Sequence, residues 1–296
     1  MIVVQIIGGL GNQMFQYALG RRLSIERQVP LKLDLSAFNS YTLRRYHLDH
    51  FNIHAEITTP DELLHFRSRR IDRRLKRRIE RLTRPYYTRS IVNEQTPDFD
   101  PRVLRVGSDV WLNGYWQNEK YFDTIQAVIR EDFMLGTPPS PANRDVLRRI
   151  EATQSVSLHI RRGDYASNPA TNQYHGLLPL TYYEQAAAKI ASWVRDPHFF
   201  VFSDDPRWAQ EHLRLGFPTY IININDPEHG HEDLRLMSTC QHHIIANSSF
   251  SWWGAWLSGY PQKLVYAPAQ WFSDPTMNAQ YTLPDNWQRI STPLAE

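Results

Sequence analysis

The sequence contains a single cysteine, Cys240, among 296 residues. One thiol excludes an intrachain disulfide and fits a protein that folds in a reducing compartment. The nearby residues Met237, Ile244 and Ile245 are apolar, so we expect Cys240 to be buried and unreactive.

Long hydrophobic runs are also absent, since no apolar segment approaches the roughly 20 residues that a helix needs to cross a bilayer. Segment 2–7 is apolar, but no basic residues precede it and glycines follow it, so it predicts a first β-strand and not a secretion signal. The chain is 42% hydrophobic and 22% charged, which is usual for globular proteins. Its length suffices for two domains, and we expect a cytoplasmic protein.

The glycine pattern of a dinucleotide-binding turn is incomplete. Gly9 and Gly11 follow the first predicted strand, but Met14 occupies the position of the third glycine. The pattern therefore indicates nicotinamide or flavin binding only weakly. Backbone amides around Gly9, Gly11 and Asn12 would still let another ligand approach, and a tight turn without a ligand is the alternative.

Motifs for nucleoside triphosphates and metals are missing as well. There is no Walker lysine motif, and Asp204-Asp205 has no third carboxylate at metal-ligand spacing. His229–Asp233 and His242-His243 contain imidazoles, but imidazoles in a loop or at the start of a strand are more often exposed or hydrogen-bonded than metal-bound. We expect no metal and no organic cofactor.

Positive charge is concentrated in one segment. Residues 67–84 contain ten Lys or Arg and two acidic residues, a net charge of +8, which leaves −6 for the rest of a chain of net charge +2. Ile71, Leu75, Ile79 and Leu82 recur at helical spacing and predict a basic helix with a narrow apolar stripe. Such a helix could lie on an anionic membrane, face an acidic partner, or pack its stripe on its own domain.

Strands and helices alternate along the chain, which predicts the α/β class with parallel sheets. Segments 2–7, 10–23 and 31–35 read as strand, helix and strand. The proline-rich segment 137–141 breaks the chain, and a domain boundary is expected near it, with domains taken as 1–152 and 153–296. In the second domain, predicted strands cover 155–160, 198–202, 219–224, 243–246 and 263–266, separated by helices at 179–193, 206–215, 231–240 and 252–257. This rhythm is typical of a doubly wound, Rossmann-like sheet.

Two adjacent arginines, Arg161 and Arg162, follow the predicted strand 155–160. Guanidinium groups keep their charge and are rarely buried without a partner, and ligands bind where strands of α/β sheets end. A phosphate group would match the planar arginine fork. The alternative is an ion pair with Asp164 or with another carboxylate.

Polar residues at two further strand ends favour the phosphate interpretation. Ser203, Asp204 and Asp205 end one strand, and Asn247, Ser248, Ser249 and Ser251 lie between another strand and a helix start. Hydroxyls and free amides at a helix start suit phosphate oxygens, and carboxylates suit a ribose diol or a guanine edge. Together these residues predict a nucleoside diphosphate site. Helix caps and a turn are the simpler alternative.

The chain resembles bacterial α-1,2-fucosyltransferases of glycosyltransferase family 11 over nearly its whole length. The resemblance rests on five blocks in the same order: 8–18, 114–122, 159–165, 202–205, and 232–256 from Glu232-Asp233 to Trp256. It implies a GT-B architecture, with two α/β domains facing across a cleft. It also implies that the C-terminal domain binds GDP-fucose and that the N-terminal domain lies on the acceptor side.

The same resemblance implies a reaction without metal that inverts the donor linkage and forms an α-1,2 bond to the 2-hydroxyl of a terminal galactose. Arg161 is then expected on the leaving phosphate, with His159 and Arg162 orienting it. Asp164 is either the general base or a brace for the arginines. Asp34, Glu119, Glu232 and Asp233 are weaker candidates for the base, and a late proton loss to water is the other alternative.

The acceptor implied is a galactose-terminated glycan, such as an oligosaccharide or a lipid-linked O-antigen precursor made at the inner membrane face, where the basic helix 67–84 would have a purpose. Nucleic acid is not an expected partner. Trp116, beside a polar loop, is a candidate wall of a cleft. The alternative functions are a nicotinamide-dependent oxidoreductase that uses the Gly9–Gly11 turn, or a non-catalytic glycan-binding protein.

Overall fold

The computed structural model describes residues 1–67, 71–163, 176–273 and 282–291. The chain divides into two compact units, Met1–Gly136 and Thr137–Glu296. The division falls at the proline-rich segment, and the helix before residue 152 belongs to the second unit and not to the first. It does so because Ile150, with Val146 and Leu147 beside it, packs against Phe200 and Leu236 of the second unit.

The first unit is built on a five-stranded parallel sheet of order β3-β2-β1-β5-β4. Its strands are β1 (Ile2–Gln5), β2 (Leu31–Asp34), β3 (Glu56–Ile57), β4 (Ile91–Asn93) and β5 (Val110–Asn113). Its α-helices are α1 (Leu10–Arg27), α2 (Pro60–Arg67), α3 (Ile71–Thr83) and α4 (Gln126–Asp132), and 3-10 helices cover Ser36–Asn39, Leu48–His50, Tyr86–Thr88, Pro101–Arg105, Glu119–Tyr121 and Asp123–Ile125. The predicted opening of strand, helix and strand is confirmed.

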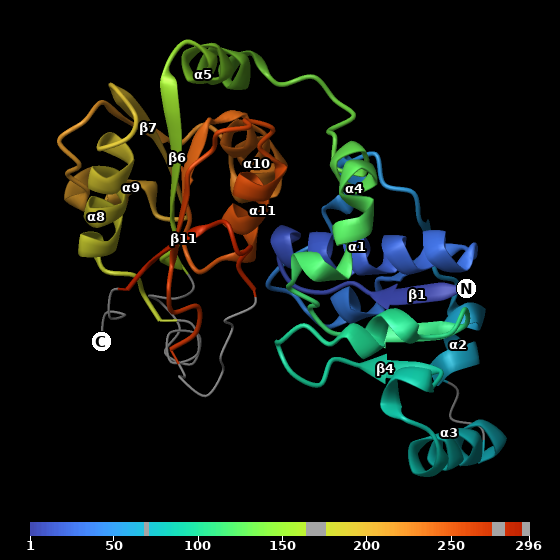
Figure 1. The fold of residues 1–296 in the computed structure, drawn as a ribbon. Coiled ribbons are helices and arrows are strands. Elements are labelled where there is room, and N and C mark those ends of the chain that lie inside the picture. The colour runs from blue at the N-terminus through green and yellow to red at the C-terminus, as the bar shows by residue number, and fades with distance from the viewer. Residues whose placement is uncertain (68–70, 164–175, 274–281, 292–296) are drawn as a thin grey trace. The chain divides into compact units, whose positions relative to one another are not determined.

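Helix α1 packs closely on this sheet (Figure 1). A Cβ atom at Gly20 would lie 2.5 Å from Val4 Cγ2 and 2.8 Å from Leu31 Cδ1, so only glycine allows α1 to approach β1 and β2 as it does. Val3 and Val4 are fully buried in the sheet. Strands β1 and β5 are parallel neighbours, and α1 begins shortly after β1 ends. The carboxyl ends of the two strands therefore lie side by side next to the start of α1.

The second unit contains a six-stranded parallel sheet of order β11-β10-β9-β6-β7-β8. Its strands are β6 (Gln154–Ile160), β7 (Pro197–Ser203), β8 (Thr219–Ile222), β9 (His242–Ile244), β10 (Val265–Pro268) and β11 (Gln288–Ile290). Its α-helices are α5 (Pro141–Glu151), α8 (Leu180–Ala191), α9 (Pro206–His212), α10 (Gly230–Thr239) and α11 (Ser249–Leu257), with a 3-10 helix at Pro227–His229. The last strand predicted from the sequence, 263–266, does not end the sheet, because β11 pairs with β10 beyond it.

This strand order is that of the Rossmann sheet, in which the chain starts in the centre, builds one side through β7 and β8, and returns to build the other. The direction reverses between β6 and β9. Ligands of open α/β sheets bind at such a reversal, outside the carboxyl ends of the strands. The prediction of an α/β fold with a Rossmann-like second domain is confirmed.

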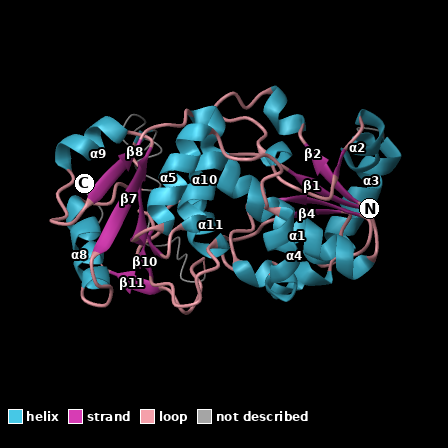
Figure 2. Cartoon of the chain, turned by 90° about the horizontal axis from the view of Figure 1, so that it is seen from above, coloured by secondary structure: helices cyan, strands magenta, loops and turns pink. Residues whose placement is uncertain are grey.

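Helices cover both faces of the second sheet, with α8 and α9 on one side and α5, α10 and α11 on the other (Figure 2). Neighbouring residues of β7 serve opposite faces, since Phe199 and Val201 pack in the cluster with Ala209 of α9, whereas Phe200 and Phe202 pack with Leu236 of α10. Both faces are apolar because both are buried, as in other parallel sheets. Cys240 is fully buried within the second of these clusters, as predicted.

The central strand β6 carries a buried polar row of Ser155, Ser157 and His159, alternating with apolar residues that face α8. Ser157 Oγ is hydrogen-bonded to His243 Nδ1 of the adjacent strand at 2.8 Å. Burial holds the pKa of His243 well below its ordinary value, so this imidazole is neutral. A buried neutral histidine makes folding sensitive to acid.

The described part of the α3 stripe does not pack on the domain, and the side chain of Ile71 lies outside the described residues. Among the side chains of α3 that the structure describes, Leu75, Ile79 and Leu82 are 56%, 50% and 79% exposed. Packing of the stripe on the first unit, one of the alternatives drawn from the sequence, is therefore excluded for these three residues. Within the described parts of the chain, the structure has no helix of the length and apolarity needed to span a bilayer.

We predict that His243 makes the stability of the protein fall as the pH is lowered from about 6.5, the usual pKa of an unfolded histidine. Below that pH the unfolded chain binds a proton that folded His243 does not, which costs up to about 1.4 kcal/mol per pH unit. Urea denaturation between pH 7 and pH 5 measures this slope. His243→Asn, which retains an acceptor for Ser157, should reduce the slope by about one proton, and an unchanged slope would contradict the assignment.

Candidate functional site

The predicted site residues of the second unit meet at the carboxyl ends of β6, β7 and β9. Ile160 pairs with Ser203 in the β6–β7 register, so Arg161 and Asp204 come next on adjacent strands. On the other side, Leu158 pairs with Ile244, which places the segment after β9 beside the same end of β6. These ends flank the reversal point between β6 and β9.

Arg161 forms an ion pair with Asp204, with 2.7 Å between Arg161 Nη1 and Asp204 Oδ2. The backbone N–H of Arg162 donates to the other oxygen, Oδ1, at 2.8 Å. The two side chains of the ion pair are 20% and 23% exposed, so both remain accessible to a ligand. Asp204 thus holds the Arg161 guanidinium at the carboxyl end of β6.

Gly163 allows this arrangement. A Cβ atom at this position would lie 2.7 Å from Asp204 Oδ2 and 3.0 Å from its carboxyl carbon. Because Asp204 is held by Arg161 and by the Arg162 amide, its carboxylate can move away only by giving up these bonds. The loop after β6 therefore needs glycine there.

Arg162 stacks on an aromatic ring that the sequence analysis did not single out. Its guanidinium carbon lies 3.9 Å from the centroid of the Trp208 ring. Trp208 in turn stacks on His212 one turn along α9, with 4.8 Å between ring centroids. Arg162 Nε is buried and has no hydrogen-bond partner. The only signal in the sequence for a role of Trp208 at the site is its place in the first turn of α9, the helix that begins directly after Asp205.

His159 is buried beneath the arginines. It is 5% exposed, and its ring lies 5.7 Å from that of Phe250 in α11. Burial lowers the pKa of His159 to about 4; the charge of Arg161 lowers it further and Asp204 opposes the shift. His159 is therefore neutral near pH 7, and its Nδ1 atom has no hydrogen-bond partner.

Ser203 and Asp205 have local structural roles. Ser203 Oγ accepts the N–H of Asp205 at 3.0 Å, and Asp205 caps α9 by accepting the N–H of Trp208 at 3.1 Å. The alternative of a turn and a helix cap thus describes these two side chains, while Asp204 alone among the three contacts the arginines.

The segment from Asn247 to Ser251 forms the start of α11. The buried Asn247 amide donates to the carbonyl oxygens of Gly176 and Trp271, both at 3.3 Å, and so ties three loops together. Ser248 is the N-cap residue but its side chain makes no capping bond, and Ser251 Oγ donates to Ser248 O at 3.3 Å. With Ser249, the first residue of α11, these residues place the start of the helix at the carboxyl edge of the sheet.

Two acidic residues at the start of α10 differ in their surroundings. Glu232 is 7% exposed and lies 3.0 Å from Arg235 Nε, so it is charge-paired. Asp233 accepts a hydrogen bond from Asn225 Nδ2 at 2.8 Å, and burial raises the pKa of Asp233 to about 6. Asp164, the first candidate for the base, lies outside the described residues.

The predicted residues of the first unit form a hydrogen-bonded turn. The residue with positive φ is Gly8 (87°) and not Gly9 or Gly11, the two glycines that the sequence pattern emphasised. Asn12 Oδ1 accepts a hydrogen bond from Gln117 Nε2 at 2.8 Å and so links the start of α1 to the segment after β5.

Asp34, a weaker candidate for the base, has a structural role. Its carboxylate is fully buried and accepts the indole N–H of Trp111 at 3.0 Å and the backbone N–H of Ser36 at 2.9 Å. These bonds fix the end of β2 to β5.

The segment after β5 is fixed by Glu94. Its two carboxylate oxygens accept the N–H groups of Tyr115 and Trp116 at 2.7 and 2.8 Å, and burial raises its pKa. A Cβ atom at Gly114 would lie 2.4 Å from the Cβ of Glu94. Trp116 has a φ of 56°, is 1% exposed, and packs edge-on against Tyr121, so it offers no open ring face for a sugar.

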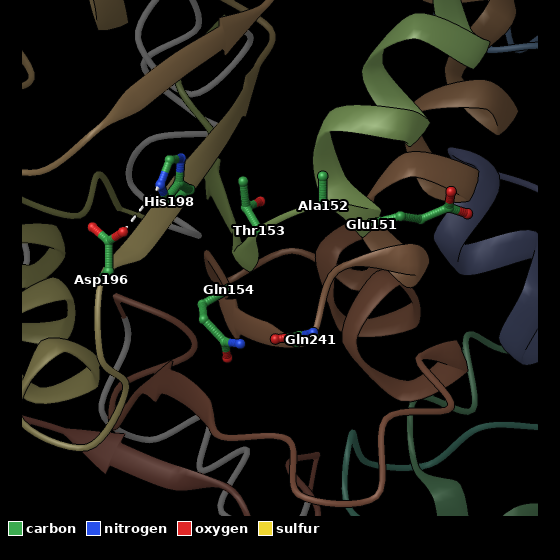
Figure 3. Close-up of a pocket in the computed structure, with 7 residues that line it drawn as sticks. All are labelled: Glu151, Ala152, Thr153, Gln154, Asp196, His198 and Gln241. Atoms are coloured by element: carbon green, nitrogen blue, oxygen red, sulfur yellow. Dashed lines mark ion pairs between the residues drawn. The ribbon is translucent and has the colours of Figure 1, made fainter.

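A small cavity of about 270 Å³ lies at the opposite end of the second sheet (Figure 3). Gln154, His198 and Gln241, at or next to the amino ends of β6, β7 and β9, line it, together with Asp196. It is remote from the arginines along the strands. In the described ranges, no group of three or more His, Cys, Asp or Glu side chains is placed to hold a metal ion.

Comparison with known proteins shows a clear family match. The family model described as "Glycosyl transferase family 11" matches residues 1–291. An Escherichia coli alpha-1,2-colitosyltransferase is 36% identical over 98% of this chain and 99% of its own length. The O-antigen biosynthesis glycosyltransferase WbnK of Escherichia coli is 34% identical over 90% and 93%. A galactoside alpha-(1,2)-fucosyltransferase 2 of Sus scrofa is 27% identical over 61% and 51%.

Solved structures with similar folds are distant in sequence. An Arabidopsis thaliana FUT1 mutant in complex with GDP has a TM-score of 0.49 and 12% identity, covering 93% of this chain and 72% of that one. The Escherichia coli ADP-heptose lps heptosyltransferase II has a TM-score of 0.47 and 11% identity, covering 98% and 89%.

We predict that Gly163→Ala disrupts the Arg161–Asp204 ion pair, because its Cβ atom would occupy the space of the Asp204 carboxylate. The expected loss of unfolding free energy is about 1–3 kcal/mol, as for other overpacked sites, and urea denaturation measures it. Gly259→Ala is the control, since no atom lies within 4 Å of the added Cβ. Equal stability of the two variants would show that the loop is not fixed by close packing.

Proposed function

The chain belongs to glycosyl transferase family 11, and we propose that it transfers L-fucose from GDP-β-L-fucose to the 2-hydroxyl of a terminal galactose, with inversion to an α-1,2 linkage. The observation that carries the proposal is the pair of arginines at the reversal point of the second sheet. One is braced by Asp204 and the other is stacked on Trp208. Two fixed guanidinium groups, with the start of α11 at the same edge of the sheet, suit a nucleoside diphosphate.

The charges of the site suit a leaving phosphate. Arg161 and Asp204 form an ion pair, His159 is neutral, and Arg162 adds a second positive charge beside this pair. During transfer the bond from the anomeric carbon to the phosphate oxygen breaks, and negative charge grows on the diphosphate. A guanidinium already held in place stabilises that charge without reorganisation. We assign this role to Arg161, with His159 and Arg162 orienting it.

The new bond forms between the galactose 2-oxygen and the anomeric carbon, and the hydroxyl proton must leave. Asp164 stays the first candidate to accept this proton. Glu232 and Asp34 are less suitable, because an arginine pairs with the first and two hydrogen bonds hold the second. Asp233, whose pKa is raised to about 6, is better poised to accept a proton, but Asn225 holds it at the start of α10.

A second donor is favoured by one finding. The full-length similarity to an alpha-1,2-colitosyltransferase supports colitose as the alternative sugar. Colitose is fucose without its 3-hydroxyl. A site that hydrogen-bonds this hydroxyl discriminates strongly against colitose, whereas a site that does not contact it accepts both sugars. The choice between the two donors then depends on whether the site contacts this one hydroxyl.

The test is an assay of GDP-fucose and GDP-colitose with a panel of β-galactosides and lipid-linked glycans, in the presence of a chelator. We expect GDP release and an α-1,2-fucosylated product with galactose-terminated acceptors, unaffected by the chelator. Linkage analysis of the product reports the regiochemistry. If sugar is transferred from GDP-colitose and not from GDP-fucose, the proposed donor is wrong and colitose takes its place. If neither donor gives transfer to any galactoside, the proposal is overturned.

Arg161→Lys should lower kcat about 100-fold or more, because lysine keeps the charge but loses the planar fork that Asp204 orients. The measurement is the initial rate of GDP release with a saturating acceptor. Arg207→Lys, an exposed arginine of α9, is the matched control and should retain full activity. Near-normal turnover of Arg161→Lys would remove this residue from the assigned role.

Trp208→Leu should raise the KM for the donor about three- to tenfold with a smaller change in kcat, because loss of the stacked ring releases Arg162. Trp208→Phe keeps a ring face and should restore most of the affinity. Trp193→Leu, in which a 79% exposed indole is removed, controls for loss of a tryptophan. If the Phe and Leu variants have the same donor KM, the ring does not position Arg162.

A further inference from the structure

Helix α3 exposes an apolar stripe in the most basic segment of the chain. Leu75, Ile79 and Leu82 are spaced by four and three residues, so they share one face of the helix, and each is at least half exposed. Arg78 and Arg81 are exposed on the flank of this stripe. We call these five residues the α3 face.

The opposite side of the helix is attached to the first unit by polar contacts. Glu80 is 6% exposed, and its Oε2 accepts hydrogen bonds from Ser90 Oγ at 2.9 Å and from Ser90 N at 3.3 Å. Arg89 donates to the carbonyl oxygens of Arg81 and Arg84, both at 3.1 Å. The helix therefore turns a carboxylate toward the protein and its leucines toward solvent, the reverse of an ordinary surface helix.

The orientation of α3 is fixed by its attachment next to the edge of the first sheet. Ser90 directly precedes β4, the edge strand of the first sheet, and α3 extends outward beyond that strand (Figure 1). Contacts at Glu80, Arg81 and Arg84 fix its last turn, so the orientation of the exposed stripe is set by the protein and is not a matter of free rotation.

We propose that the α3 face binds the surface of an anionic lipid bilayer, with its leucine and isoleucine side chains in the interfacial layer and its arginines at the lipid phosphates. Residues 67–84 carry a net charge of +8, whereas the rest of the chain carries −6, so this segment attracts an anionic partner. The apolar stripe selects lipid over nucleic acid, because nucleic acid offers phosphate but no apolar layer for three exposed aliphatic side chains.

The proposal does not rest on the sugar transferred, since binding to vesicles needs no turnover. It accounts for an exposed apolar surface that would otherwise cost solubility. It also assigns the acceptor a location, because a protein held at a lipid surface meets lipid-linked acceptors there at a raised effective concentration.

The first experiment is cosedimentation of the full chain with vesicles of phosphatidylcholine alone or mixed with phosphatidylglycerol. We expect binding only to the anionic vesicles, weakening as salt is added. Arg78→Gln with Arg81→Gln should weaken binding roughly thirtyfold, from about 1 kcal/mol per charge. Leu75→Gln, Ile79→Gln and Leu82→Gln together should weaken it at least tenfold.

The controls change exposed arginines and exposed large apolar side chains elsewhere in the chain. Arg195→Gln with Arg207→Gln removes two exposed arginines of the second unit, and Leu43→Gln with Trp193→Gln removes two side chains that are 72% and 79% exposed. Both controls should bind anionic vesicles as the unaltered protein does. GDP release with a soluble galactoside should be the same in all variants, which separates vesicle binding from catalysis.

A second experiment reports contact directly. Because Cys240 is fully buried, Leu82→Cys provides a single accessible thiol for an environment-sensitive dye. The dye emission should shift to the blue when anionic vesicles are added, and a dye at Leu43→Cys should not respond. No shift at position 82, or a stripe variant that binds vesicles normally, would overturn the proposal. Equal binding of RNA by the unaltered and stripe variants would assign the face to a polyanion instead.

Discussion

The parallel register between β6 and β7 is the constraint on which the candidate site depends. Pairing of Ile160 with Ser203 brings Arg161 next to Asp204, and the same turn aims the Arg162 amide at the other carboxylate oxygen. A slip of one residue would move every side chain of β6 to the opposite face of the sheet. It would turn Arg161 toward the face that α8 covers and separate its side chain from Asp204. The chemistry of the site is therefore specified by strand pairing before any ligand binds.

The surroundings of β6 explain why this strand tolerates polar residues in the middle of a sheet. Ser157 and His243 satisfy each other, and His159 stays neutral because burial opposes its protonation. Small side chains on this face also leave room for the aromatic start of α11, where Phe250 reaches the His159 ring. The cost is a core that loses stability in acid, and the benefit is an uncharged imidazole directly beneath two guanidinium groups.

The sequence was a good guide wherever local pattern and chemistry coincide. The alternation of strands and helices, the buried thiol and the convergence of loops at one sheet edge all followed from periodicity and from the geometry of parallel sheets. The strand order, the extra edge strand β11 and the Trp208 stack did not, because they depend on contacts between residues distant in the chain. The α3 stripe shows a different limit. The helical spacing of its apolar residues is the same whether the stripe faces the protein or solvent. The contact of the buried Glu80 with Ser90 decides the orientation, and it turns the stripe toward solvent.

The close fit of Glu94, Gly114 and Trp116 has a consequence for how this chain can change in evolution. A side chain at position 114 would overlap Glu94, and the left-handed backbone of Trp116 is held by the Glu94 carboxylate. A substitution at any one of these three positions removes a contact that constrains the other two. These positions should therefore show epistasis: a change at one is tolerated only in a background that has already changed at another, so that the segment after β5 is inherited as a block.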